Sequence, residues 1–147
     1  MKVLIQRVLN ARVAINGLQA GAIDKGFVVF LCVVKGDTLT ELEYICRKTV
    51  NLRIFEDANG KMNLSLKDVN GSVLAISQFT LASDCKKGNR PSFDMAEEPA
   101  RARELYEAFV ERLRREGVNT VTGEFAANMQ ISLTNDGPVT FMLDSRL

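Results

Sequence analysis

Apolar and polar positions divide the chain into strand-like and helix-like segments separated by short polar breaks. Val and Ile recur through residues 2–9 and 11–16, and Asn16-Gly17 after them is a favoured two-residue hairpin turn. The continuous apolar run over residues 27–34 predicts a strand that is buried on both faces. The first part of the chain therefore predicts a series of strands.

Two helices are predicted from apolar stripes at helical spacing. Thr38 and Glu41 have the spacing of a capping box at the start of a helix over residues 38–53. Pro99 is a good first-turn residue for a second helix, which stops at Gly117.

The other segments predict strands. Residues 72–82 read as a central strand with alternating faces, and shorter strands are predicted around residues 54–55, 62–66, 119–122, 129–133 and 139–143. Many strands with two main helices indicate a mixed α/β fold class whose sheets are largely antiparallel, with the helices on one face. We expect a single domain over residues 1–147.

The composition limits how the chain could bind nucleic acid and which catalytic groups it could use. The chain of 147 residues has 19 basic and 18 acidic side chains, so bulk charge cannot hold nucleic acid and any such contact needs a local patch. It has no histidine, which excludes Ser-His-Asp and Cys-His catalysis and HExxH zinc sites. A base would have to be a carboxylate or a lysine with a shifted pKa.

The cysteines suggest neither a disulfide framework nor a zinc site, because there are three of them and none has CxxC spacing. Cys32 and Cys46 lie in apolar patterns and are expected in the core, whereas Cys85 lies in a polar loop. No apolar run approaches ~18 residues and no signal-peptide layout is seen. We expect a cytoplasmic protein without a membrane partner or a metal site.

Three polar residues interrupt the predicted central strand. Ser77, Gln78 and Thr80 could simply end the strand and bond to their neighbours. Alternatively, the strand opens into a pocket where the backbone N–H groups of Phe79 and Thr80 face a substrate, as in an oxyanion hole. Thr80 as a nucleophile would need an adjacent base, and the sequence places none.

Residues 135–138, Asn-Asp-Gly-Pro, are most simply a hairpin turn between the last two strands. A cis Gly137-Pro138 bond would instead point adjacent carbonyl groups in nearly the same direction and form a rigid acceptor surface. The base rate of cis X-Pro bonds, about 5–6%, does not favour that alternative.

Basic residues stand out in two places. Lys86, Lys87 and Arg90 form the densest basic loop, which is either a solvated loop or a contact for a polyanion lying across the pocket. Arg7 lies among apolar residues of the first strand, so its guanidinium must reach solvent or bond to carbonyl groups.

Five segments together resemble the D-aminoacyl-tRNA deacylase family along nearly the whole chain. They are MKVLIQRV at residues 1–8, NLRIFED at 51–57, GKMNLSL at 60–66, SQFTL at 77–81 and NDGPVT at 135–140. Each segment alone is a short pattern, but their joint order and spacing are highly specific.

The resemblance implies a three-layer helix/sheet/sheet fold and a homodimer with active sites at the subunit interface. It implies that Ser77, Gln78, Phe79 and Thr80 line the pocket and supply backbone donors, with Met129 nearby. Two further roles are implied at the interface. Gly137 and Pro138, linked by a cis bond, enter the partner's pocket and exclude L-amino acids, and Arg7 helps to hold their orientation.

The implied reaction is hydrolysis of the ester between a D-amino acid, or glycine, and the 3′-terminal adenosine of tRNA, a proofreading step that needs no cofactor. Either Thr80 attacks, or the substrate's vicinal 2′-hydroxyl assists; we favour the latter because Thr80 lacks a visible base. Two other hypotheses are a non-enzymatic RNA-binding module that uses the basic loop, and a structural dimer whose polar strand seals an interface.

Overall fold

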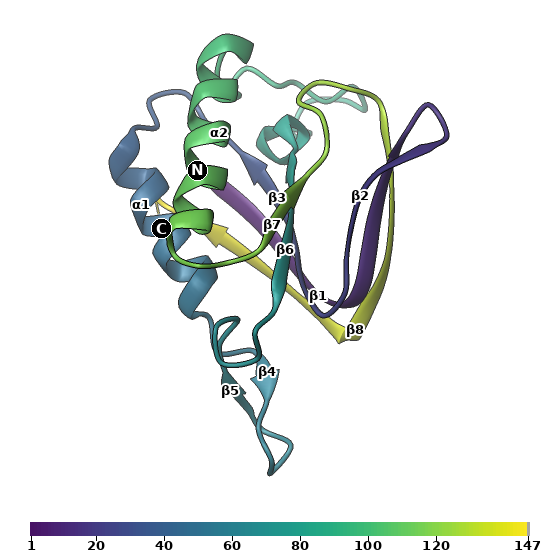
Figure 1. Ribbon diagram of the computed structural model, residues 1–147. Coiled ribbons are helices and arrows are strands. Elements are labelled where there is room, and N and C mark those ends of the chain that lie inside the picture. Colours follow the sequence, from purple (N-terminus) through teal and green to yellow (C-terminus); the bar gives the residue numbers. More distant parts are fainter. Residues whose placement is uncertain (147) are drawn as a thin grey trace.

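The computed structural model describes residues 1–146, so residue 147 of the expected domain lies outside the described residues. Figure 1 shows two helices beside a bent sheet, with a small hairpin projecting at one end. The elements in chain order are β1 (Lys2–Ile15), β2 (Leu18–Ile23), β3 (Gly26–Cys32), α1 (Leu39–Asn51), β4 (Phe55–Glu56), β5 (Met62–Leu64), β6 (Ser72–Ser77), the 3-10 helix η1 (Phe79–Ala82), α2 (Pro99–Arg115), β7 (Thr120–Thr122) and β8 (Met129–Asp144).

The main sheet is mixed, as the sequence predicted. Its strand order is β2-β1-β3-β6-β7, and β8 pairs with β1. Strand β1 is antiparallel to β2, β3 and β8, whereas β3, β6 and β7 are parallel to one another. Strands β4 and β5 form a separate antiparallel pair.

Two hydrophobic cores lie on opposite faces of the central strands, which confirms the helix/sheet/sheet layers. On one face, Val29 and Ala75 belong to the core that includes the apolar stripes of α1 and α2. On the other face, Val28 and Leu74 pack with Val13 and neighbours from β1, β2 and β8. The second sheet layer is thus formed by β2, the C-terminal half of β1 and the N-terminal half of β8 (Figure 1).

The two strands predicted at residues 2–9 and 11–16 form one strand, β1, so the predicted break between them is wrong. Its pairing with β8 slips on both sides of Val8. The buried face changes at the same place: Ile5 belongs to the helix-side core, whereas Val8 belongs to the core between the sheets. These irregularities bend the strand from one layer into the other.

Both predicted helices are confirmed. Thr38 and Glu41 form the capping box of α1, in which the Glu41 carboxylate accepts from the Thr38 backbone N–H at 2.7 Å. Pro99 occupies the first turn of α2, and Gly117, with φ +83°, follows the end of the helix. The Tyr106 hydroxyl donates to the Ala75 carbonyl at 2.9 Å, which fastens α2 to β6. Burial raises the pKa of Tyr106 to about 12, so the hydroxyl keeps its proton.

Candidate active site

Strand β6 ends at Ser77, so the prediction of a strand through residue 82 is wrong beyond that point. The Gln78 backbone N–H still donates to Leu31 O at 2.8 Å, but β3 ends one residue later and offers no further partner. The chain therefore turns into η1, where the Leu81 N–H donates to Gln78 O at 3.2 Å. The first turn of a helix leaves its own N–H groups without intrahelical acceptors. Within the described residues, this leaves the amides of Phe79 and Thr80 available.

Side chains around this turn hold it from two sides. The Gln78 amide donates to the Thr80 hydroxyl, and Phe79 meets Phe93 edge-on with ring centroids 5.0 Å apart. Beneath them the buried Cys32 thiol donates to the Phe79 carbonyl at 3.6 Å. Burial raises the pKa of Cys32 to about 11, so the thiol stays protonated and remains a donor. The prediction that Cys32 is a core residue is confirmed.

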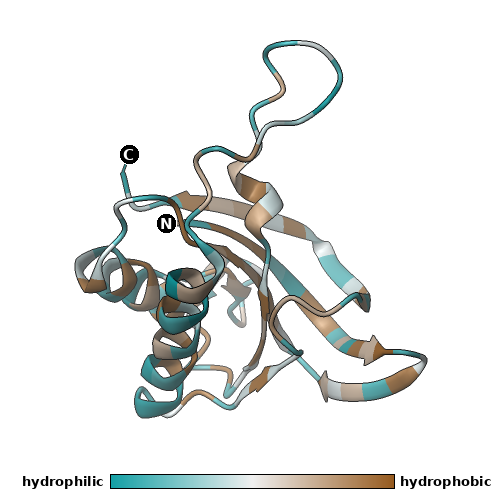
Figure 2. Cartoon of the chain, turned by 90° about the horizontal axis from the view of Figure 1, so that it is seen from above, coloured by the Kyte–Doolittle hydropathy of each residue, from teal (hydrophilic) through white to brown (hydrophobic). Residues whose placement is uncertain are grey.

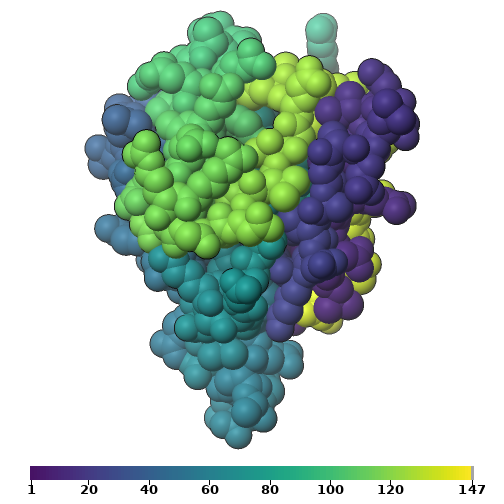
Figure 3. All heavy atoms as spheres, viewed as in Figure 1, coloured from purple at the N-terminus to yellow at the C-terminus, as the bar shows by residue number. Residues whose placement is uncertain are grey.

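A cavity of about 490 Å³ opens beside this turn, between α2 and the segment that follows β7 (Figure 3). Three of the predicted site residues line it from the β6 side, namely Ser77, Gln78 and Phe79, and Met129 lines it from β8. Thr80 is exposed and is not a lining residue, although its hydroxyl contacts Gln78. The structure therefore brings together most of the predicted pocket, with Thr80 beside it.

Part of the cavity wall was missed by the sequence analysis. Residues 125–128, together with Ala102 of α2, line the cavity opposite the turn. Ala126 has a positive φ of 64°, which is uncommon for a residue with a side chain and occurs where the surroundings fix the backbone. A Cβ at Gly123 would lie 2.4 Å from Met129 Sδ, so a larger residue there would require the Met129 side chain in the cavity wall to move. The signal available in the sequence was the three small residues Gly123, Ala126 and Ala127 between two predicted strands.

Backbone hydrogen bonds attach another part of the cavity wall to the segment after β3. The Glu97 N–H donates to Val33 O at 3.0 Å, and the Lys35 N–H donates to Met95 O at 2.9 Å. This support is itself anchored by the buried Asp37, whose carboxylate accepts from the Val34 N–H at 2.7 Å.

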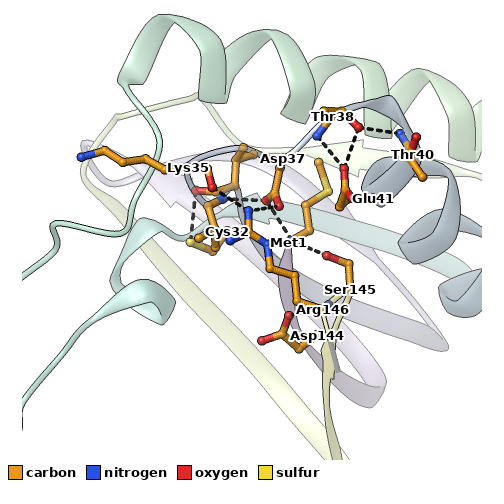
Figure 4. Close-up of polar contacts among 12 residues, drawn as sticks. Met1, Cys32, Lys35, Asp37, Thr38, Thr40, Glu41, Asp144, Ser145 and Arg146 are labelled. Carbon is orange, nitrogen blue, oxygen red and sulfur yellow. Dashed lines mark hydrogen bonds and ion pairs between the residues drawn. The ribbon is translucent and has the colours of Figure 1, made fainter.

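The Asp37 carboxylate is at the centre of a buried ion cluster. The Met1 ammonium lies 2.8 Å from one carboxylate oxygen, and Arg146 Nη2 lies 2.9 Å from the other. Figure 4 shows these contacts converging on Asp37, with Ser145 as a further partner of Met1. Since Asp37 also holds the segment behind the cavity wall, the cluster ties the cavity to the sheet.

The prediction of a hairpin turn at residues 135–138 is wrong. Strand β8 stays antiparallel to β1 on both sides of this segment, so the chain does not reverse. Val8 pairs with Asn135 and Gln6 pairs with Thr140, so the residues between them form a bulge on β8. The Gly137-Pro138 bond within it is cis, and both residues are exposed.

Arg7 lies under this bulge and is only 4% exposed. Of the two alternatives expected for its guanidinium, the structure shows bonding to carbonyl groups and not exposure to solvent. Nη1 donates to Ile54 O at 2.6 Å, and Nε donates to Asp136 O at 3.2 Å. Nε also lies 3.2 Å from the Asp136 carboxylate. The Asn135 side chain donates to Arg7 O at 2.9 Å and to Val139 O at 3.0 Å, which closes the bulge on itself.

Within one chain the bulge lies far from the cavity. Val8, which pairs with Asn135, also pairs with Gly26, and Gly26 pairs with Ser72 at the start of β6. The cavity lies at Ser77, at the other end of that strand. At about 3.3 Å per residue, the two ends of β6 are roughly 16 Å apart. A single chain therefore does not bring Gly137 and Pro138 to the cavity.

The basic loop projects from the body of the protein next to η1 (Figure 2). A backbone bridge between Asp84 and Ser92 closes its base, and Lys86, Lys87 and Arg90 are exposed on it. None of the three basic residues lines the cavity.

Over residues 1–146, no three metal-ligating side chains of His, Cys, Asp or Glu gather into a group that could hold an ion. No helix in the same range is long and apolar enough to cross a membrane.

Known proteins are similar to this chain over nearly its whole length. The chain matches the D-Tyr-tRNA(Tyr) deacylase family over residues 4–144. It is 53% identical over 146 residues to the D-aminoacyl-tRNA deacylase of Geobacter sulfurreducens, covering 99% of this chain and 96% of that protein. It is 51% identical to the protein of the same description from Thermosipho africanus, over 99% of this chain and 98% of that one.

Two solved structures share the fold. One, described as a c-Myc DNA unwinding element binding protein, superposes with a TM-score of 0.93 at 41% identity, over 98% of both chains. The other, described as a probable eukaryotic D-amino acid tRNA deacylase, has a TM-score of 0.82 at 16% identity, over 97% of both chains.

The bent helix/sheet/sheet domain thus has the fold and the sequence of a class of aminoacyl-tRNA deacylases. The chain belongs to the D-Tyr-tRNA(Tyr) deacylase family, which confirms the resemblance found in the sequence.

Proposed function

We propose that this protein hydrolyses the ester bond between a D-amino acid, or glycine, and the 3′-terminal adenosine of tRNA, and leaves L-aminoacyl-tRNA intact. The observation that supports this most is the cavity beside the amides of Phe79 and Thr80, in a chain of this family. The role would be proofreading in the cytoplasm.

The aminoacyl ester is reactive enough to be cleaved by a site that supplies only backbone hydrogen-bond donors. The carbonyl oxygen of the ester would sit at the amides of Phe79 and Thr80, which stabilise the negative charge that develops during attack. The Thr80 hydroxyl accepts from the Gln78 amide, and within the described residues no hydrogen bond joins it to a carboxylate or a lysine. Attack by water, assisted by the substrate's own 2′-hydroxyl, therefore suits this site better than attack by Thr80.

Selection of the D-enantiomer is assigned to Gly137 and Pro138 of a second copy of the chain. Because the bulge cannot reach the cavity of its own chain, a homodimer with active sites at the interface would join the two. The bulge is exposed and is continuous with Met142 on the same strand, a large apolar residue that is 55% exposed. Rigid carbonyl groups at the cavity would leave no space for an L side chain, and this rejects more strongly than a favourable contact selects.

The test is incubation of the protein with D-tyrosyl-, L-tyrosyl- and glycyl-tRNA, with release of the amino acid followed over time. We expect cleavage of the D-tyrosyl and glycyl esters and survival of the L-tyrosyl ester. Equal rates for the two tyrosyl enantiomers, or no release at all, would contradict the proposal. Sedimentation of the free protein as a monomer at assay concentration would contradict the shared site.

The exposed basic loop favours a contact with the tRNA phosphates. Lys86, Lys87 and Arg90 are exposed on the loop that follows η1. Phosphate contacts weaken as salt concentration rises, by a slope that follows the number of neutralised phosphates. Replacing all three by Gln should raise KM and flatten its salt dependence. If binding of tRNA persists without any hydrolysis, the protein is the RNA-binding module instead.

A further inference from the structure

A basic groove lies at the C-terminal end of α1, away from the cavity. Its volume is about 440 Å³, and its described lining, which contains no acidic residue, is Arg47, Lys48, Asn51, Leu52 and Arg53. The three basic residues are exposed, and within residues 1–146 none of them takes part in an ion pair. Only Lys48 lies in the last turn of the helix, where a cation stabilises the helix dipole. The other two charges need another explanation.

The charged groups of the groove are held in place without being neutralised. The Arg47 guanidinium and the Lys48 ammonium lie over the ring of Tyr44, 5.8 and 5.6 Å from its centroid. The Arg53 guanidinium donates from Nε to Asn63 O at 2.7 Å, and from Nη2 to the Asn63 side chain. Aromatic and amide partners fix the positions of these groups and carry no negative charge. The groove therefore presents its positive charge to an anionic ligand.

The groove is attached to the bulge of β8 through one buried side chain. Arg53 is followed by Ile54, whose carbonyl oxygen accepts from Arg7 Nη1 at 2.6 Å. The same guanidinium donates from Nε to Asp136 O at 3.2 Å. The carboxylates of Asp136 and Glu56 lie 3.2 and 3.9 Å from this guanidinium, so they face Arg7 and not the groove. In the proposed homodimer, where the bulge enters the partner's cavity, the groove would therefore lie beside the mouth of that cavity.

The proposed substrate supplies an anion at that position. Only the 3′ end of tRNA would enter the cavity, and the described cavity lining contains no lysine or arginine. Contacts to the phosphates must then come from surfaces around the mouth. Guanidinium and ammonium groups bind phosphate oxygens by charge-assisted hydrogen bonds. The basic loop that follows η1 would supply such contacts from the chain that owns the cavity, and the groove would supply them from the other chain.

We infer that the groove of one copy binds backbone phosphates of the acceptor stem of the tRNA whose 3′ end occupies the cavity of the other copy. The inference rests on the proposed function and adds to it an RNA-binding surface that acts across the dimer. Phosphate contacts of this kind are made equally in the ground state and the transition state, so their loss changes KM and leaves kcat unaltered. Each lost contact also lowers the dependence of binding on salt concentration.

The double variant Arg47→Gln/Lys48→Gln tests the groove. On D-tyrosyl-tRNA it should raise KM about tenfold at constant kcat, and it should lower the slope of log KM against log salt concentration by about two. The matched control is Arg114→Gln/Arg115→Gln, which removes an adjacent basic pair from the end of the other helix. Arg114 donates to Thr120 O of β7, and neither residue of this pair lines the groove. The control should keep the wild-type KM and slope, and thermal unfolding above the assay temperature would show that both variants are folded.

The deciding measurement identifies the copy that supplies the groove. Ala102 lines the cavity, so a heterodimer in which one copy carries Ala102→Trp should keep a single open cavity. The groove variant should raise KM when it is placed on the filled copy and should leave KM unchanged when it is placed on the open copy. A KM that rises only from the open copy, rises equally from both, or does not rise would overturn the inference, as would an equal effect of the control pair. Failure of the proposed function is distinct from these outcomes, because the wild type would then not cleave D-tyrosyl-tRNA.

Discussion

The cavity and the bulge at residues 135–140 are built in opposite ways. The cavity has mostly apolar and neutral walls, and the available backbone amides of Phe79 and Thr80 follow the end of β6 beside it. The bulge has no cavity, but it is tied down by the buried Arg7 and by the Asn135 amide. Under the proposed function, cleavage needs little beyond placement of a reactive ester, whereas discrimination needs a rigid surface.

The largest effect is expected from Arg7→Ala. This change leaves Ile54 O and the underside of the bulge without their buried donor, at a cost of about 3–5 kcal/mol. Arg7→Lys keeps the charge but cannot reproduce the planar fork, and should lose somewhat less. Urea unfolding measures both, and an Arg7→Ala protein as stable as the wild type would show that the bulge does not depend on Arg7.

At the cavity end, Asp37→Asn tests the buried ion cluster. It removes the negative charge that faces the Met1 ammonium and Arg146, and we expect a loss of about 2–3 kcal/mol. Because Asp37 anchors the segment behind the cavity wall, KM should rise more than kcat falls. Glu111→Gln, at an exposed pair on α2, is the control and should change stability by about 0.5 kcal/mol or less. A Tm equal to that of the control would contradict the anchoring role.

Gly137→Ala is expected to have a smaller cost in stability. Its φ of +127° is a backbone conformation that side chains rarely adopt, and an added Cβ would lie 2.6 Å from Val139 Cγ2. We expect a loss of about 1–3 kcal/mol. Gly60→Ala is the control, since Gly60 also has a positive φ, +72°, but nothing lies within 4 Å of an added Cβ. Equal losses in thermal unfolding would mean that the packing of the bulge adds nothing.

Thr80→Ala should have the smallest effect on turnover. Its backbone N–H remains, and its hydroxyl only accepts from Gln78. Substantial activity should persist in single-turnover assays with D-tyrosyl-tRNA. A loss of ~10⁴-fold or more, which is the range seen when a nucleophile is removed, would restore Thr80 as the attacking group.

Much of the fold could be predicted from local pattern, because its determinants are local. The capping box of Thr38 and Glu41 and the stop at Gly117 depend on neighbours a few residues away. The Asn16-Gly17 hairpin turn is confirmed for the same reason, with both residues at positive φ. The core positions of Cys32 and Cys46 followed from apolar periodicity.

The failures have a common cause, which is a partner strand that is distant in sequence. Residues 135–138 have turn composition, but β1 is long enough to pair with β8 on both sides, so they form a bulge. Strand β6 was predicted too long because its end is set by where β3 ends. Likewise, Ala102 joins the cavity only through the packing of α2, which no local pattern encodes.

The most direct test of the division between cleavage and selection is the ratio of kcat/KM for D-tyrosyl- and L-tyrosyl-tRNA, measured for the wild type and for Gly137→Ala. A distorted bulge should keep most of the activity toward the D-ester and gain activity toward the L-ester, so that the ratio falls. If both activities fall together at an unchanged ratio, the bulge is part of the cleavage machinery and the account is wrong.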